Sequence, residues 1–104
     1  MISRDLLIIS GYNKISIINI NYYELIREIE IPNSGRISGV CMLNKNILFT
    51  GDEKGMIREW KIEEDNLILI SKKENAHKNY ITALLNIGNG HFASCSVDKS
   101  IKIW

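Results

Sequence analysis

The sequence lacks an excess of either charge and lacks a long apolar run. Its 13 basic and 12 acidic residues give a net charge of +1. Nonspecific binding to nucleic acid or to an anionic membrane needs a strong basic excess, so neither partner is expected. No apolar run approaches the roughly 18 residues of a membrane span. The early run Leu6–Ile9 is also too short and too poorly flanked for a secretory signal.

Cysteine is scarce as well. Cys41 and Cys95 fall in predicted strands of different repeats, so we expect buried free thiols in a reducing compartment rather than a disulfide. This favours an intracellular protein, cytoplasmic or nuclear. The two cysteines and the two histidines, His77 and His91, lack any short ligand spacing, so no zinc site and no cofactor are expected.

What the sequence does contain is a repeat. Residues 36–60 (RISGVCMLNKNILFTGDEKGMIREW) align without a gap with residues 80–104 (YITALLNIGNGHFASCSVDKSIKIW), an offset of 104 − 60 = 44 residues. This offset lies within the roughly 40–45 residues of a four-stranded propeller blade. An earlier, partial copy begins near residue 5. The apolar positions that coincide between the two longer copies include Ile37 with Ile81, Leu48 with Phe92, and Trp60 with Trp104.

The last copy carries a spaced set of polar side chains and a tryptophan. Ser94 precedes Asp98 by four positions, Asp98 precedes Trp104 by six, and His77 lies upstream. This pattern resembles the WD-repeat propeller family, which includes the β subunit of heterotrimeric G proteins. In that family a His precedes the first strand, a Ser or Thr lies in the second, an Asp in the next turn and a Trp in the third. The resemblance covers nearly the whole chain, in one complete repeat and two partial ones.

The resemblance implies that these four side chains form a hydrogen-bonded ladder within one blade. His77 would donate to Asp98 from one ring nitrogen and meet Ser94 through the other, while Trp104 would offer its indole N–H. A Ser-His-Asp catalytic reading of the same residues is the weaker alternative, and no catalytic residue is predicted. In the middle repeat the His and Asp positions are occupied by Asn33 and Lys54, so the full ladder is expected to be absent there.

The predicted fold is all-β, with antiparallel four-stranded blades of an incomplete WD-repeat propeller. Residues 5–31 are expected to form a partial blade with its second, third and fourth strands, 37–72 a complete blade, and 81–104 a partial blade with its first three strands. Glu24–Ile31 fits a helix or a strand, and its place in the repeat favours the outer strand. A closed ring needs about 4–8 blades, so we expect these residues to be part of a larger propeller, and an end at Trp104 favours truncation. The predicted strands are Leu6–Ser10, Ile15–Ile20, Glu24–Ile31, Ile37–Leu43, Ile47–Gly51, Met56–Ile62, Leu67–Lys72, Ile81–Ile87, His91–Ser96 and Ile101–Trp104.

These observations predict a non-catalytic scaffold that binds proteins or peptides, or a subunit of a larger assembly with further blades from the same or another chain. Two alternatives stay open: a targeting segment of an enzyme whose catalytic domain lies elsewhere, and a small homo-oligomeric β domain that binds a ligand. By position in the family, contacts are expected in the loops before the inner strands and in the turn with the Asp. Tyr and Arg are enriched at binding hot spots, although each candidate also fits a solvated loop residue. The candidates are Ser34, Arg36, Glu53, Lys78, Tyr80 and Val97.

Overall fold

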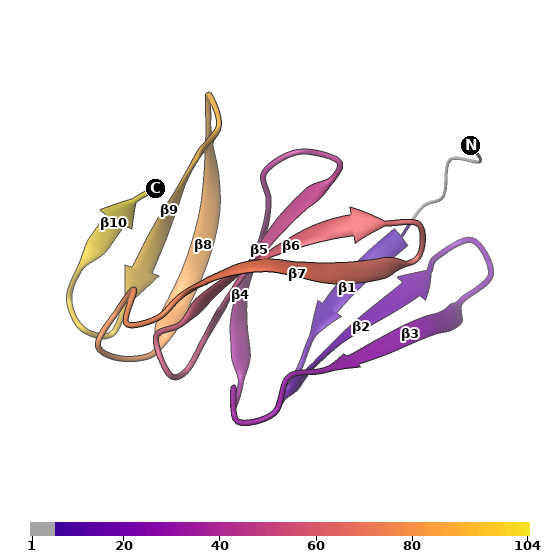
Figure 1. Cartoon of the computed structure of the whole chain (residues 1–104), viewed down its shortest axis with the longest axis horizontal. Helices are drawn as coiled ribbons and strands as arrows, with labels where there is room; N and C mark the ends of the chain where they lie inside the picture. Colours follow the sequence, from indigo (N-terminus) through magenta and orange to yellow (C-terminus); the bar gives the residue numbers. More distant parts are fainter. Residues whose placement is uncertain (1–5) are drawn as a thin grey trace.

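The computed structural model describes residues 6–104, and every regular element in that range is a β-strand. The strands form three antiparallel sheets, ordered β1-β2-β3, β4-β5-β6-β7 and β10-β9-β8. The sheets follow one another across the molecule without closing a ring (Figure 1), so the predicted all-β fold is confirmed. Their bounds are β1 Leu6–Ser10, β2 Lys14–Asn19, β3 Glu24–Glu30, β4 Ile37–Met42, β5 Ile47–Asp52, β6 Ile57–Glu63, β7 Asn66–Lys73, β8 Ile81–Gly88, β9 His91–Ser96 and β10 Ile101–Ile103.

The strand bounds differ from the predicted ones by a residue at several ends. The ambiguous segment is the strand β3, which pairs antiparallel with β2. Its helix reading is therefore wrong, because the backbone donors and acceptors of the segment are used by the neighbouring strand. Residue 5 of the first predicted blade lies outside the described residues. The division of the chain into one complete and two partial blades, and the position of each strand within its blade, stay predictions.

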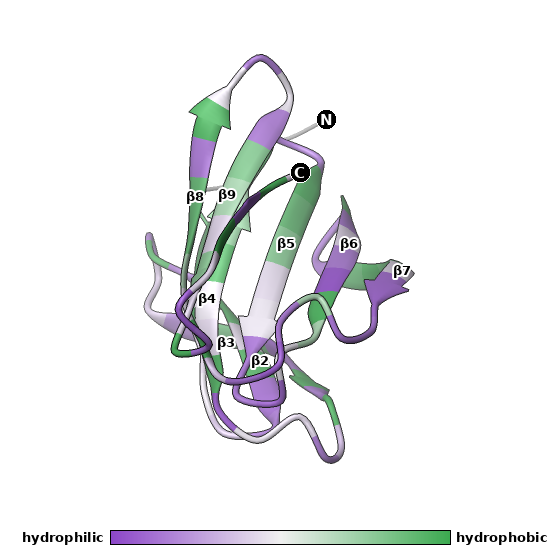
Figure 2. Ribbon diagram, turned by 90° about the vertical axis from the view of Figure 1, so that its left-hand side faces the viewer, coloured by the Kyte–Doolittle hydropathy of each residue, from purple (hydrophilic) through white to green (hydrophobic). Residues whose placement is uncertain are grey.

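Two apolar clusters hold the sheets together. The alternation of side chains along β5 sends Leu48 to the first cluster and Phe49 to the second. The middle sheet is thus covered on both faces at β5, whereas Ile68, Leu69 and Ile70 of β7 are exposed. Figure 2 shows β5 apolar in its first part and polar at its end. Full burial of one such side chain contributes about 1.5–3 kcal/mol. The first cluster contains Ile15, Ile17, Ile31, Ile37, Leu48, Trp60 and Leu67, and the second Cys41, Phe49, Ile57, Ala76, Ile81, Leu84 and Phe92.

The two flanking sheets are each covered on one face. On β1, Leu6 and Ile8 pack against the first cluster, whereas Leu7 and Ile9 point to the opposite face and are exposed. The third sheet likewise leaves apolar side chains of β8 and β10 exposed. In the part of the chain that the structure describes, no helix is long and apolar enough to span a membrane. The exposed residues on the third sheet are Leu85, Ile87, Ile101 and Ile103.

Candidate functional site

The buried polar set of the last repeat is assembled from four separate elements. His77 lies in the loop between β7 and β8 and is 1% exposed, and its backbone N–H donates to the carbonyl of Gly55 over 3.0 Å. Ser94 lies in the middle of β9 and is fully buried. Asp98 is in the turn between β9 and β10, and Trp104 follows β10. The chain thus brings a loop, a strand, a turn and the residue after β10 to one point at the third sheet.

Direct hydrogen bonds join these four side chains. His77 Nδ1 lies 3.0 Å from Asp98 Oδ2, and His77 Nε2 lies 2.6 Å from Ser94 Oγ. The Trp104 indole Nε1–H donates to Ser94 Oγ over 2.9 Å. His77 Nδ1 also lies 2.9 Å from Ser100 Oγ. With the ring proton on Nδ1, His77 donates to Asp98 and accepts the Ser94 hydroxyl proton. Ser94 accepts from the indole in turn.

Asp98 is held as a carboxylate by several donors. The Ser100 hydroxyl donates to Asp98 Oδ1, the backbone N–H of Lys78 donates to Oδ2 over 3.0 Å, and the backbone N–H of Ser100 donates to Oδ1 over 2.9 Å. With the bond from His77, these donors hold the pKa of Asp98 well below its usual range, and the Ser100 hydroxyl has the largest effect. Sequence reasoning missed Ser100, although a hydroxyl two residues after a turn Asp is a common turn partner.

The arrangement fits a structural role for Ser94 rather than that of a nucleophile. Ser94 has no exposed surface, and its hydroxyl is shared between His77 and Trp104. A substrate therefore has no approach to its oxygen in this conformation. Among residues 6–104, the structure also places no three His, Cys, Asp or Glu side chains together in a way that could hold a metal ion.

The middle sheet has a different polar arrangement at the equivalent place. The Trp60 indole N–H donates to Thr50 Oγ1 over 2.9 Å, as in the last repeat. Asp52 is 2% exposed and pairs through Oδ2 with Arg58 Nη1 over 2.6 Å. Asp52 Oδ1 also accepts from the backbone N–H of Lys54 and of Met56. The predicted strands Ile47–Gly51 and Met56–Ile62 left Asp52 in the segment between them, and sequence reasoning missed this buried ion pair. Its signal was an Asp and an Arg on adjacent strands.

Five loops gather at one end of the molecule, the lower end in Figure 1, and backbone contacts link them in series. Tyr12 and Arg36 form an isolated antiparallel bridge between the first and second sheets. The Glu53 N–H donates to the Arg36 carbonyl over 2.9 Å, and the Val97 N–H donates to the Tyr80 carbonyl over 2.9 Å. These two bonds are related by the repeat offset, since 97 − 53 and 80 − 36 are both 44.

Most of the predicted partner-contact residues border this end. Arg36, Lys78 and Val97 are exposed, and Glu53 and Tyr80 are half-buried. We call this surface the loop face, defined by those five residues.

Ser34 does not belong to the loop face, and its prediction as a surface residue was wrong. It is fully buried, and its hydroxyl donates to the Gly35 carbonyl over 3.1 Å. The loop turns inward there because Gly35 adopts a φ of +69°, and the Gly35 N–H donates to Asn13 Oδ1 over 2.6 Å. The position two residues before Arg36 therefore does not reach the surface.

Comparison with known proteins matches residues 70–104 to the family described as "WD domain, G-beta repeat". The chain thus contains one segment, residues 70–104, that is similar to a WD repeat. Among curated WD-repeat proteins, it is 28% identical over 65 residues to the WD repeat-containing protein 55 homolog of Dictyostelium discoideum. That match covers 62% of this chain and 15% of the relative, so the chain spans a small part of the relative's length.

A solved structure described as "Crystal Structure of Mitotic Checkpoint Complex" contains a chain of similar fold. The superposition has a TM-score of 0.81 at 20% sequence identity, and covers 95% of this chain and 31% of the other chain. At this identity the likeness concerns the fold alone. The chain thus has the fold of part of a propeller, with antiparallel sheets and no closed ring over residues 6–104.

Proposed function

We propose that this WD-repeat chain is a non-catalytic protein-interaction module that works together with further blades, from the same chain or from another. WD-repeat domains generally mediate protein interactions, which supports the proposal. The observation that carries it is the pair of exposed apolar faces on the two flanking sheets. Leu85 is 63% exposed and Ile103 60% exposed on the third sheet, and Leu7 is 46% exposed on the first. Contiguous exposed apolar side chains of this kind mark surfaces that another protein surface covers.

The second part of the proposal concerns the loop face. Once neighbouring blades cover the apolar sheet faces, this end stays accessible, because it consists of turns rather than of sheet surface. We propose that it contacts a protein or peptide partner through Arg36 and Tyr80, with Glu53, Lys78 and Val97 around them. Arg and Tyr offer large contact areas and several donors, and they are enriched among residues that dominate binding energy.

We also propose that the protein works inside the cell. Cys41 is a buried free thiol and Cys95 a half-buried one. Burial raises the pKa of the Cys41 thiol, which keeps it protonated and slow to oxidise. Two unpaired thiols are compatible with a reducing compartment.

The first test addresses the apolar faces. Light scattering after size-exclusion chromatography reports the mass of the chain, and we expect association that weakens when Leu85 and Ile103 are both replaced by Thr. Tyr22→Thr is the matched control, because Tyr22 is 72% exposed in the turn between β2 and β3. A monodisperse, folded monomer for the unmodified chain would contradict the need for further blades.

The second test addresses the loop face. A propeller that contains this chain is used to capture its partners, and the recovered partners are compared for wild type, Arg36→Ala and Tyr80→Ala. We expect both variants to recover less of at least one partner while they unfold at the same temperature as wild type. Equal recovery by all three proteins would remove the loop face from the proposal and leave the apolar faces as the interaction surfaces.

A further inference from the structure

An open cleft of about 560 Å³ lies on the loop face, between the β1–β2 turn and the starts of β4 and β8. Tyr12 and Arg36, which form the bridge between the first two sheets, stand on one side of it, and Tyr80 comes from the third sheet. All three sheets therefore contribute to one concave site. Among the described residues that line the cleft, none is acidic, and its polar side chains are Ser10, Tyr12, Arg36, Ser38, Tyr80 and Thr82.

Several hydrogen-bond donors in the cleft have no partner within residues 6–104. The Arg36 guanidinium forms neither an ion pair nor a hydrogen bond with any described residue, because Glu53 Oε1 accepts instead from the Arg36 backbone N–H. The phenol groups of Tyr12 and Tyr80 likewise have no partner within that range. By contrast, the Ser38 and Thr82 hydroxyls donate to backbone carbonyls. The free donors are thus one cation and two phenols.

The charges around the cleft have a clear arrangement. At this end, three acidic side chains accept hydrogen bonds from donors within the protein. Asp52 pairs with Arg58, and Glu53 accepts from a backbone N–H. Asp98 accepts from His77 and from backbone N–H groups. The basic side chains are exposed, and the exposed acidic residues at this end are Glu74 in the β7–β8 loop and Glu30 at the end of β3. An approaching anion therefore meets a positive potential. The exposed basic residues are Arg36, Lys54, Lys78 and Lys99.

We propose that this cleft binds the oxyanion of an acidic or phosphorylated side chain in a partner peptide. The planar guanidinium of Arg36 matches the two oxygens of a carboxylate or phosphate, which gives a bidentate, charge-assisted contact. Tyr12 and Tyr80 supply phenol donors to the same group and aromatic surface to the neighbouring peptide residues. This inference rests on the proposed function, since it names the chemistry of the partner that the loop face would bind.

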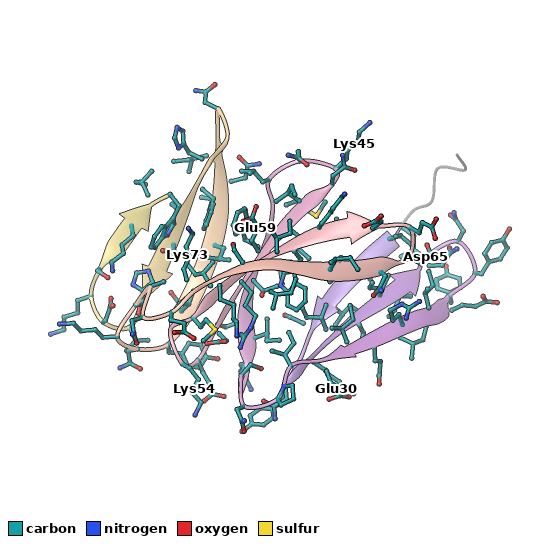
Figure 3. All side chains as sticks on the ribbon, in the orientation of Figure 1. Glu30, Lys45, Lys54, Glu59, Asp65 and Lys73 are labelled. Atoms are coloured by element: carbon teal, nitrogen blue, oxygen red, sulfur yellow. The ribbon has the colours of Figure 1, made fainter. Side chains whose placement is uncertain are left out.

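The experiment measures direct binding of fluorescent peptides to the whole chain by fluorescence anisotropy. One peptide is rich in Asp and Glu, a second carries phosphoserine in a neutral sequence, a third replaces every acidic residue by its amide, and a fourth is rich in lysine. Arg36→Gln and Tyr80→Phe are tested beside Lys45→Gln, which removes the same charge at the far end of β4. Figure 3 shows Lys45 at the opposite end of the molecule from Lys54, which lies in a loop beside Arg36.

We expect the acidic or the phosphorylated peptide to bind at least about tenfold more tightly than the amide and lysine peptides. Arg36→Gln should remove this preference, Tyr80→Phe should weaken it, and Lys45→Gln should leave it unchanged. The ranking of the acidic and phosphorylated peptides then distinguishes a carboxylate from a phosphate ligand.

Equal binding of the amide peptide, no measurable binding of any peptide, or equal losses in Arg36→Gln and Lys45→Gln would each overturn the inference. Those results would leave the proposed function standing if partner capture by the propeller still depended on Tyr80. Loss of both peptide binding and Tyr80-dependent capture would instead remove the loop face altogether. Circular dichroism of each variant verifies that it is folded, which Arg36→Gln should be, because the structure uses the Arg36 backbone and not its guanidinium.

Discussion

The Nε2 atom of His77 lies 2.6 Å from the Oγ atom of Ser94, and both side chains are buried. A buried polar group that loses its partner keeps its desolvation penalty, which makes such a pair sensitive to the removal of either side. The same histidine reaches Asp98 through its other nitrogen, so one ring connects the strand β9 to the turn that follows it.

The first prediction concerns this pair. His77→Ala and Ser94→Ala should each lower the free energy of unfolding by about 1–3 kcal/mol, because each leaves buried donors or acceptors unpaired. Urea unfolding followed by tryptophan fluorescence measures the change. His91→Ala is the control, because His91 is exposed, and its effect should stay within about 0.5 kcal/mol. Losses no larger than the control's would contradict a supporting role for the ladder.

The second prediction concerns pH. Because the pKa of Asp98 is lower in the folded chain than in the unfolded chain, Asp98 contributes stability that is fully present above pH about 4. This contribution is lost as the pH falls through the folded-state pKa. Asp98→Asn should therefore flatten the dependence of unfolding free energy on pH below about 4. Glu24→Gln, at the exposed start of β3, should leave the profile unchanged, and a profile equally steep in Asp98→Asn would contradict the assignment.

The third prediction concerns the buried ion pair of the middle sheet. At the repeat offset of 44, Ser96 and Lys102 occupy the positions of Asp52 and Arg58. Asp52→Ser alone leaves the Arg58 charge buried without its partner and should cost about 3–5 kcal/mol. The double variant Asp52→Ser, Arg58→Lys should cost less than the single one, because the slimmer, more flexible lysine chain can turn its ammonium to solvent or to a carbonyl. Thermal and urea unfolding test this order, and a double variant less stable than Asp52→Ser would contradict it.

The fourth prediction compares two glycines with similar backbone angles. Gly55 has φ +83° and Gly88 has φ +90°, so alanine is strained at both by about 1–2 kcal/mol. A Cβ at Gly55 would also lie 2.1 Å from the His77 carbonyl oxygen, whereas a Cβ at Gly88 meets no atom within 4 Å. Gly55→Ala should therefore be clearly less stable than Gly88→Ala in urea unfolding. Equal stabilities would show that the loop carrying His77 moves aside without cost.

Repetition made much of the fold predictable. The 44-residue offset was enough to place Trp60 and Trp104 in like surroundings, because each indole donates to a hydroxyl on the neighbouring strand over 2.9 Å. A repeat offset of this kind predicts the positions of strand residues well, because the side chains of a strand alternate between its two faces with a fixed period. The resemblance to the family also allowed the last repeat, which has the His and the Asp, to be predicted as the one with the full ladder.

Loop paths and cross-strand partners were less predictable. Ser34 was misplaced because the loop reverses at Gly35, whose backbone angle cannot be read from a repeat offset. The Asp52–Arg58 pair was missed because it depends on which side chains of β5 and β6 share a face, and not on a family position. The role of Ser100 depends on the fold of one turn. In each case the missing information was a local three-dimensional path.

The paired backbone bonds of the loop face, Glu53 to Arg36 and Val97 to Tyr80, are equally long although only one of the two repeats has a histidine ladder. The backbone of these loops is thus maintained by main-chain groups that every amino acid except proline provides. Substitutions can accumulate at the tips over evolutionary time without altering the trace of the loops. Copies of this module could then diverge in what they recognise while their architecture is inherited intact.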